Sequence, residues 1–139
     1  MSLFSILALF LLTSKVEFKS NFIKFDSSIY IWNLTSRQLE FTLNSSNGHV
    51  TSMQLLPNNM LASGYDNGIV RLWNLTSRQV NYTFFHLNAG NIIRLCSLKD
   101  NNNLLAVSTA YDVTIHNTMT GQKEFVFQEN PFFPILMID

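Results

Sequence analysis

Short apolar runs separated by polar turns set the pattern of this chain. In the middle of the sequence such runs occupy Val50–Leu55, Met60–Gly64, Ile69–Asn74 and Val80–Phe84. The first two are separated by Pro57-Asn58-Asn59, residue types that favour tight turns. Short β-branched and apolar runs bounded by turn residues suit strands that are covered on both faces. No helical periodicity of useful length is present, so the pattern predicts four strands in this stretch.

The same pattern recurs on both sides of the middle stretch. The heptapeptide Trp32–Gln38 is repeated without change as Trp73–Gln79, 41 residues later, and a weaker copy, His116–Gln122, follows after a further 43 residues. A period of about 40–45 residues is typical of the four-stranded sheets, or blades, of a β-propeller. Further strands are therefore predicted at Ile29–Trp32, Glu40–Leu43, Val113–His116 and Glu124–Phe127.

At these residues the chain resembles the WD-repeat β-propeller family. Val50–Trp73, with Leu61-Ala62-Ser63-Gly64 and then Val70-Arg71-Leu72-Trp73-Asn74, is similar to one full repeat, and the resemblance covers roughly residues 22–128. It implies an all-β fold, a partial β-propeller of about three four-stranded antiparallel blades that is not closed, because closure typically takes about 4–8 blades. Residues 1–21 are then a degenerate start of the first blade, 22–129 the blades, and 130–139 a tail or the severed start of a further blade.

The resemblance also implies a buried hydrogen-bonded set of His, Ser or Thr, Asp and Trp in each blade. A buried indole N–H can only donate and a buried carboxylate needs donors, so a satisfied chain of this kind fixes strand positions. No repeat carries the complete set, because Phe22 stands in the Ser position of the first repeat, Asn67 in the Asp position of the second and His116 in the Trp position of the third. The residues assigned to the network are Asp26, Trp32, Ser63, Asn67, Trp73, His86, Ser108, Asp112 and His116.

Propellers of this family present loops at the rim of a central channel to peptides or proteins. The resemblance therefore implies a protein–protein interaction scaffold whose partner the sequence does not name. The candidate partner-binding residues lie in the loops expected on that face, and they are Ser46, His49, Tyr65, Asp66, Asn88 and Tyr111. The alternative for each is that it only forms a turn. His49 is also a candidate for the buried network, but its place directly before Val50 favours the loop.

Composition and charge exclude several function classes. Nine basic and nine acidic residues give a formal net charge of zero, and no basic tract occurs, which argues against nucleic acid as a partner. The three histidines are far apart and Cys96 is the single cysteine, so we expect no metal site and no disulfide framework. The chain has no Gly-rich phosphate loop and no candidate acid–base pair. We therefore predict no catalytic residues, no cofactor and no enzymatic activity.

The apolar segment Leu3–Leu12 bears on localisation. It is too short for a membrane-spanning helix, and we expect no membrane association. It has the length of a signal-peptide core, but no Lys or Arg precedes it and Leu12 occupies a position where a cleavage site needs a small residue. The other interpretations are a buried first strand or a start created by truncation. A single cysteine fits a reducing compartment, so we predict a cytoplasmic protein, and a secreted one if Leu3–Leu12 is a signal core.

Three blades cannot close a ring, and this leaves two explanations for the chain. It is either a fragment of a longer propeller, or a partial propeller that associates with copies of itself or with another chain through its end blades. The end blades are expected to expose apolar side chains that a neighbour normally covers. The candidates are Ile29, Ile31, Leu104, Val107 and Ile115. An interaction scaffold is the favoured function, and a non-functional truncated fragment is the alternative.

Overall fold

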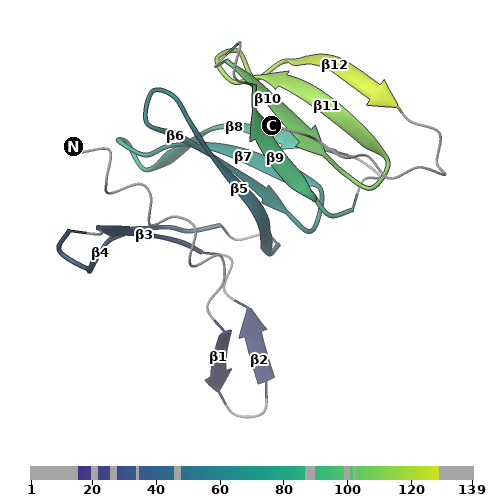
Figure 1. Ribbon diagram of the computed structural model, residues 1–139. Coiled ribbons are helices and arrows are strands. Elements are labelled where there is room, and N and C mark those ends of the chain that lie inside the picture. The colour runs from purple at the N-terminus through teal and green to yellow at the C-terminus, as the bar shows by residue number, and fades with distance from the viewer. Residues whose placement is uncertain are drawn as a thin grey trace. The chain divides into compact units, whose positions relative to one another are not determined.

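A computed structural model describes residues 16–19, 22–25, 28–33, 35–45, 48–86, 90–98, 101 and 103–128. Every helix or strand in these ranges is a β-strand, which confirms the predicted all-β fold (Figure 1). The chain divides into two compact units, residues 1–50 and residues 51–139. The two units are described separately.

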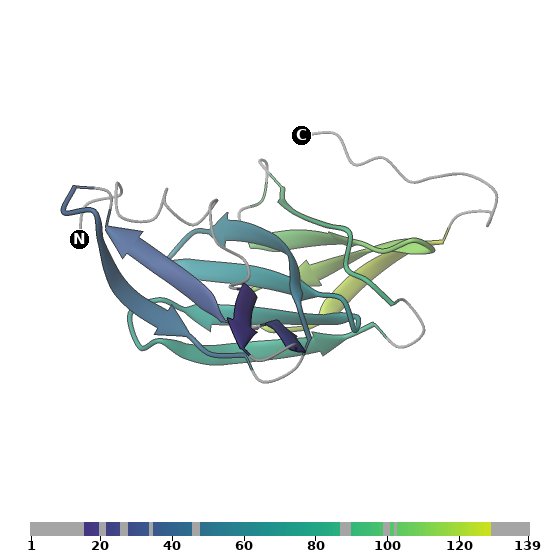
Figure 2. The ribbon, with the colours of Figure 1, turned by 90° about the horizontal axis from the view of Figure 1, so that it is seen from below.

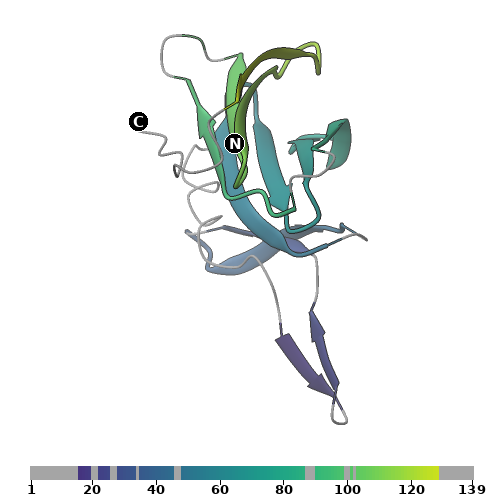
Figure 3. The same cartoon turned by 90° about the vertical axis from the view of Figure 1, so that its right-hand side faces the viewer.

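The first unit contains two antiparallel hairpins. Strand β1 (Val16–Lys19) pairs with β2 (Phe22–Phe25) and forms the purple ribbon in Figure 3. Strand β3 (Ile29–Asn33) pairs with β4 (Gln38–Leu43), and these two lie where the third and fourth strands of the first repeat are predicted. In the described residues this first repeat forms a two-stranded sheet.

The second unit contains two four-stranded sheets, which lie side by side (Figure 2). Each sheet follows the order of its strands in the sequence, so neighbouring strands are joined by short connections. The predicted strand ends in the middle repeat agree with the observed ones to within one residue. The strands of the first sheet are β5 (Val50–Leu56), β6 (Met60–Tyr65), β7 (Ile69–Asn74) and β8 (Gln79–Phe85). Those of the second are β9 (Arg94–Ser97), β10 (Leu104–Ser108), β11 (Asp112–Asn117) and β12 (Lys123–Gln128).

The hairpin formed by the third and fourth strands has the same geometry in all three repeats. In each, the register shifts by a β-bulge directly before one residue, which is Trp32, Trp73 or His116. The two tryptophans and His116 therefore occupy equivalent positions, as the sequence repeat predicts. A bulge bends and twists a strand locally. Because it recurs at one position, the repeat in the sequence is matched by a repeat in backbone conformation.

The turn after each bulge is fixed by an asparagine side chain. Oδ1 of Asn33, Asn74 and Asn117 accepts hydrogen bonds from the backbone N–H groups two and three residues later, at 2.9–3.1 Å. The residue four positions after each asparagine has a positive φ, namely 58° at Arg37, 61° at Arg78 and 72° at Gly121. Asparagine favours such turns because its side chain can bond its own backbone. The first two of these turns carry the repeated sequence Trp-Asn-Leu-Thr-Ser-Arg, and the third carries its weaker copy His-Asn-Thr-Met-Thr-Gly.

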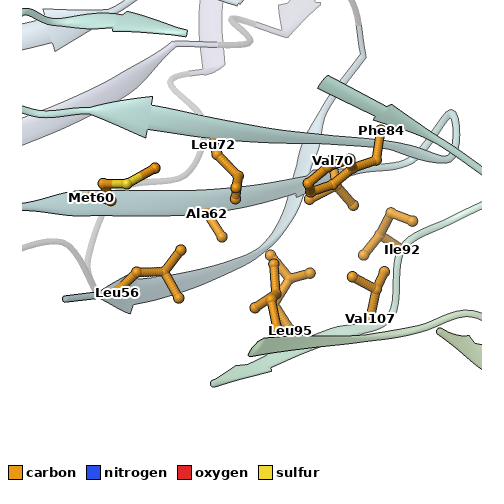
Figure 4. Packing of buried hydrophobic residues seen from close by; sticks show 10 residues of the cluster. Leu56, Met60, Ala62, Val70, Leu72, Phe84, Ile92, Leu95 and Val107 are labelled. Carbon is orange, nitrogen blue, oxygen red and sulfur yellow. The ribbon is translucent and has the colours of Figure 1, made fainter. Parts of the chain in front are cut away.

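A shared apolar core joins the two sheets of the second unit (Figure 4). One sheet contributes Ala62, Val70 and Leu72, and the other contributes Leu95, Leu105 and Val107, with Ile92 from the connecting segment. Burying an aliphatic side chain of this size contributes about 1.5–3 kcal/mol. The core is therefore the main source of cohesion between the sheets.

One glycine allows the sheets to approach closely. A Cβ atom added at Gly64 would lie 2.4 Å from Cγ2 of Ile92, a distance that non-bonded carbons do not reach. The Ile92 side chain, in the segment before β9, therefore packs directly against the backbone of β6 in the space that a side chain at Gly64 would fill. The backbone N–H of Leu95 also donates to Oγ of Ser52 at 3.1 Å, which ties β9 to β5.

The expectation that specific apolar residues of the end blades are exposed is wrong. Ile29, Ile31, Val107 and Ile115 are all buried, and Leu104 is half-buried. Val107 points toward the neighbouring sheet because it lies on the same face of β10 as Leu105, within the shared core. Ile115 packs with Ala106 and Val113 on the opposite face. The exposed apolar side chains of this sheet lie instead on its last strand, β12.

Candidate partner-binding surface

The buried polar chain of the middle repeat connects three residues. The indole Nε1 of Trp73 donates to Oγ of Ser63 at 2.9 Å, and Ser63 in turn donates to the hydroxyl of Tyr65 at 3.0 Å. All three side chains are buried. The guanidinium of Arg71 lies 5.5 Å from the centre of the Tyr65 ring, within range of a cation–π contact. The buried donors of Trp73 and Ser63 thus each have an acceptor, which is the condition for such a network to stabilise a fold.

The assignment of Tyr65 to the partner-binding surface is wrong, because its side chain is fully buried. Residues two apart in a strand point to the same face, so Tyr65 lies beside Ser63 and joins its network. The assignment of Asn67 to the buried network is also wrong. Asn67 is exposed in the turn between β6 and β7, where its Oδ1 accepts the backbone N–H of Ile69 at 3.3 Å.

In the third repeat the assignment of Ser108 to the network is wrong. His116 pairs with Leu105 across β10 and β11, and Thr114 pairs with Val107, so these four residues share one face. Ser108 lies on the other face, since successive residues in a strand alternate. Val107 therefore holds the place that Ser63 holds in the middle repeat. The Ser108 hydroxyl donates to the Thr109 carbonyl at 3.4 Å instead.

The third repeat replaces the tryptophan network with a pair of histidines. Nε2 of His116 lies 3.1 Å from Oγ1 of Thr114, and the His116 ring stacks on Phe84 with the ring centres 4.3 Å apart. The ring of His86, which follows β8, meets the His116 ring edge-on at 5.3 Å. Nδ1 of His116 and Nε2 of His86 are buried and have no hydrogen-bond partner in the described part of the chain.

Burial keeps both imidazoles neutral, and the positive charges that His86 and Lys123 can carry add to this effect at His116. The pKa of His116 is lowered to about 4, chiefly by desolvation and then by the neighbouring His86 and Lys123, while Asp112 opposes the change. Desolvation also lowers the pKa of His86, against the attraction of Asp112. At neutral pH the pair is therefore uncharged. Asp112, the first residue of β11, itself accepts a hydrogen bond from the Thr109 hydroxyl at 2.6 Å, so its carboxylate stabilises the preceding turn.

The first repeat retains only part of its predicted network in the described residues. Trp32 lies on β3 at the position equivalent to Trp73, and its Nε1 is buried without an acceptor among the residues that the structure describes. Its predicted partner Asp26 lies outside the described residues. The position that corresponds to the network serine holds Phe22, a residue type without a side-chain hydroxyl that could accept the indole hydrogen bond.

The remaining candidates for partner binding differ in their placement. His49 is half-buried directly before β5, and Asp66 is half-buried in the turn between β6 and β7. Tyr111 is exposed in the turn between β10 and β11. Ser46 and Asn88 lie outside the described residues.

Sequence reasoning missed two exposed apolar residues that lie at the same end of the sheets as Tyr111. Phe85 ends β8 and Ile93 precedes β9; their exposed fractions are 67% and 56%, and that of Tyr111 is 65%. All three lie at the same end of the two sheets as the turns between β6 and β7 and between β10 and β11. Exposed apolar residues that gather in one region are a stronger sign of an interaction surface than scattered single ones. We name Phe85, Ile93 and Tyr111 the apolar end surface.

Hydrogen bonds between loops hold this end together. The backbone N–H of His86 donates to Gly68 at 2.9 Å, that of Ile92 to the Tyr65 carbonyl at 3.0 Å, and that of Ile93 to the Ser108 carbonyl at 2.8 Å. The N–H of Tyr111 donates to the Thr109 hydroxyl at 3.1 Å. The exposed side chains are thus carried by loops that are bonded to the ends of strands, so a partner would meet a pre-organised surface.

The side chains at this end suit contacts with another molecule. Phe85 and Ile93 offer apolar contact, and Tyr111 adds a hydroxyl to an apolar ring, a combination that suits binding interfaces. Asp66 and Asn67 supply polar groups in the adjacent turn. Within the described residues no three His, Cys, Asp or Glu side chains lie close enough together to hold a metal ion. No helix in the described part of the chain is long and apolar enough to cross a membrane.

Comparison with known proteins identifies the fold. No protein-family profile matches the sequence, and no curated protein matches it either. Among solved structures, the chain is similar to one in the crystal structure of the mitotic checkpoint complex, with a TM-score of 0.67 and 17% sequence identity. The similarity covers 82% of this chain and 37% of the other. Together with the two four-stranded sheets and the repeated hairpins, it shows the fold of a partial β-propeller that is not closed.

Proposed function

We propose that this chain is a WD-repeat interaction module that binds a protein or peptide through the apolar end surface. The observation that carries the proposal is that Phe85, Ile93 and Tyr111, all more than half exposed, lie at one end of the two sheets, where hydrogen bonds join the loops to strand ends. A partner with apolar side chains and a few hydrogen-bonding groups would match this surface. The related chain belongs to a multiprotein complex, which supports a protein partner.

Two structural features support the WD-repeat assignment within the propeller fold. The Trp73 indole bonds the serine of the preceding strand, as the family pattern implies for its network. The turn after each bulge carries asparagine at the place where the family motif has aspartate, and its Oδ1 makes the hydrogen bonds that a carboxylate oxygen would make. We propose in addition that the protein is cytoplasmic, because its single cysteine fits a reducing compartment.

The binding proposal is tested by comparing partners captured by matched variants. The test variant carries Phe85→Ser and Tyr111→Ser, and the control carries Met119→Ser, an exposed apolar residue at the opposite end of β11. We expect proteins that are enriched with the wild type and the control to be lost with the double variant. The strongest of them should then bind purified wild-type chain at least about tenfold more tightly than the double variant, because an aromatic anchor typically carries that much affinity.

Equal binding by the wild type and the double variant would overturn the apolar end surface as the binding site. Circular dichroism and a thermal melt of each variant establish that the fold is retained. Both substitutions are at exposed positions, so we expect changes in stability within about 0.5 kcal/mol.

A further inference from the structure

Two phenylalanines at equivalent positions have opposite environments. Phe84 on β8 lies opposite Val70, and Phe127 on β12 lies opposite Val113, which is the matching place one repeat later. Phe84 has an exposed fraction of 6%, whereas that of Phe127 is 59%. The sheet β9–β12 covers Phe84, and no described residue gives Phe127 comparable cover. The last sheet therefore repeats an apolar surface that the preceding sheet uses for packing.

Strand β12 is also an unpaired edge with apolar side chains on both faces. In the described residues it pairs with β11 alone, and Phe125, Val126 and Phe127 are all exposed. The other outer strand, β8, has polar Thr83 at the position equivalent to Val126. Natural edge strands usually carry charges or prolines that prevent pairing with another chain, and the centre of β12 carries neither.

We propose that β12 is a self-association site, at which two copies of this chain pair their β12 strands antiparallel across a two-fold axis. With Val126 opposite its own copy, Phe125 lies opposite the partner's Phe127, and Glu124 lies opposite the partner's Gln128. Apolar residues thus face apolar residues, and no like charges are brought together. Aromatic cross-strand pairs stabilise antiparallel sheets, and a two-fold axis requires such a self-complementary surface.

The charge of the chain is compatible with a second copy as the occupant. The six residues of β12 contain one Lys and one Glu, at neighbouring positions Lys123 and Glu124. The whole chain has a formal net charge of zero, so two copies do not repel one another at long range. A short strand pair buries less than the roughly 800 Å² per partner of a standard stable interface. Association is therefore expected in the micromolar range.

Sedimentation of the full chain over a range of concentrations tests the proposal. From about 1 μM to about 200 μM, a range that brackets micromolar affinity, the average mass should rise from 15.9 kDa toward twice that value. Val126→Lys should abolish the rise, because it places two positive charges opposite each other at the axis. The matched control is Thr83→Lys at the equivalent, exposed position of β8, and it should associate like the wild type.

A charge-swap experiment separates specific pairing from loss of structure. Val126→Glu alone should also be monomeric, but an equimolar mixture of Val126→Lys and Val126→Glu should form heterodimers at least as tightly as the wild type forms dimers. A variant that had failed to fold would not be rescued by its opposite. The proposal is overturned if the wild type stays monomeric over the whole range, if Val126→Lys associates normally, if Thr83→Lys abolishes association, or if the mixture stays monomeric. None of these outcomes bears on the apolar end surface.

Discussion

The Trp73 indole and the Ser63 hydroxyl are joined by a 2.9 Å hydrogen bond between adjacent strands, inside the sheet that the sequence repeat defines most clearly. Ser63 accepts from Trp73 and donates to Tyr65, so one hydroxyl satisfies two buried aromatic groups. The middle repeat is therefore the part of the chain in which the polar network and the apolar core reinforce one another.

Removal of the Ser63 hydroxyl should leave two buried polar groups without their partner. We expect Ser63→Ala to lower the free energy of unfolding by about 1–3 kcal/mol, the cost of unsatisfied buried groups. Trp73→Ala should cost about 3–5 kcal/mol, because it also removes a large buried side chain. Urea unfolding measures both, with the exposed Ser77→Ala as a control expected within about 0.5 kcal/mol. A loss below about 1 kcal/mol for Trp73→Ala would show that this residue is not part of a core.

The turns after β7 and β11 should respond in opposite ways to substitution. Gly121 has a positive φ, and a Cβ there would lie 2.5 Å from the Tyr82 ring. Gly121→Arg, which copies the residue of the other two repeats, should therefore cost at least about 1–2 kcal/mol. Arg78→Gly, at the equivalent position with a φ of 61°, should instead stabilise the chain by up to about 1 kcal/mol because it relieves a left-handed non-glycine residue. Thermal melts of the two variants provide the comparison, and equal destabilisation by both would contradict it.

The stability of the chain should fall as pH decreases from about 6.5 to about 4. The pKa of His116 is near 6.5 in the unfolded chain and is lowered to about 4 in the folded chain, chiefly by burial and secondly by His86. Between these values the unfolded chain binds the proton more readily, so protonation favours unfolding. The stability is complete above pH 6.5, and the contribution of His116, up to about 3 kcal/mol, is lost at pH 4.

The measurement for this prediction is urea unfolding at a series of pH values. His116→Phe, which keeps the aromatic packing against Phe84, should flatten the pH dependence between 4 and 6.5 relative to the wild type. His86, whose pKa is also lowered, should supply part of the remaining slope. Identical pH profiles for the wild type and the variant would mean that His116 does not titrate in this range.

The glycosylation state should distinguish the two proposed localisations. Asn33 and Asn74 stand in Asn-x-Thr sequences, but the amide oxygen of each accepts two backbone hydrogen bonds in its turn. A cytoplasmic protein carries no N-linked glycan, so protein isolated from its native host should migrate identically before and after glycosidase treatment. A mobility shift would instead favour secretion and the interpretation of Leu3–Leu12 as a signal core.

The strands could be predicted from the sequence where their boundaries are marked by turn chemistry. The bounds of β7 were predicted without error because Asn67-Gly68 precedes it and Thr76-Ser77 follows it. The equivalence of Trp32, Trp73 and His116 followed from the repeat and is visible in their shared bulge. These features depend on residue types that are neighbours in the sequence, so a single sequence is enough to predict them.

The side-chain assignments that failed depend on which face of a strand a residue occupies. The serine position was predicted four residues before the aspartate position, which gives Ser63 from Asn67 and Ser108 from Asp112. Asn67 is six residues before Trp73, but Asp112 is only four residues before His116, so in the third repeat this count reaches Ser108 and not Val107. A slip of one residue moves a side chain to the opposite face. Tyr65 was misplaced because it adjoins a turn, although its two-residue spacing from Ser63 could have placed it inside. Phe85 and Ile93 carried no sequence signal, since their exposure depends on how the two sheets pack.

Gly64 and Phe84 have a geometric consequence beyond packing. On the face that meets the next sheet, β6 carries Ala62 and Gly64, whereas β8 carries Tyr82 and Phe84. Small side chains let the two sheets come together along one side, and large aromatic side chains keep them apart along the other, so the sheets meet at an angle. Every further sheet added by the same rule would turn in the same direction by a similar amount. The difference in size between Gly64 on β6 and Phe84 on β8 would therefore set the curvature of such an array. It would also set the number of sheets needed for a full turn.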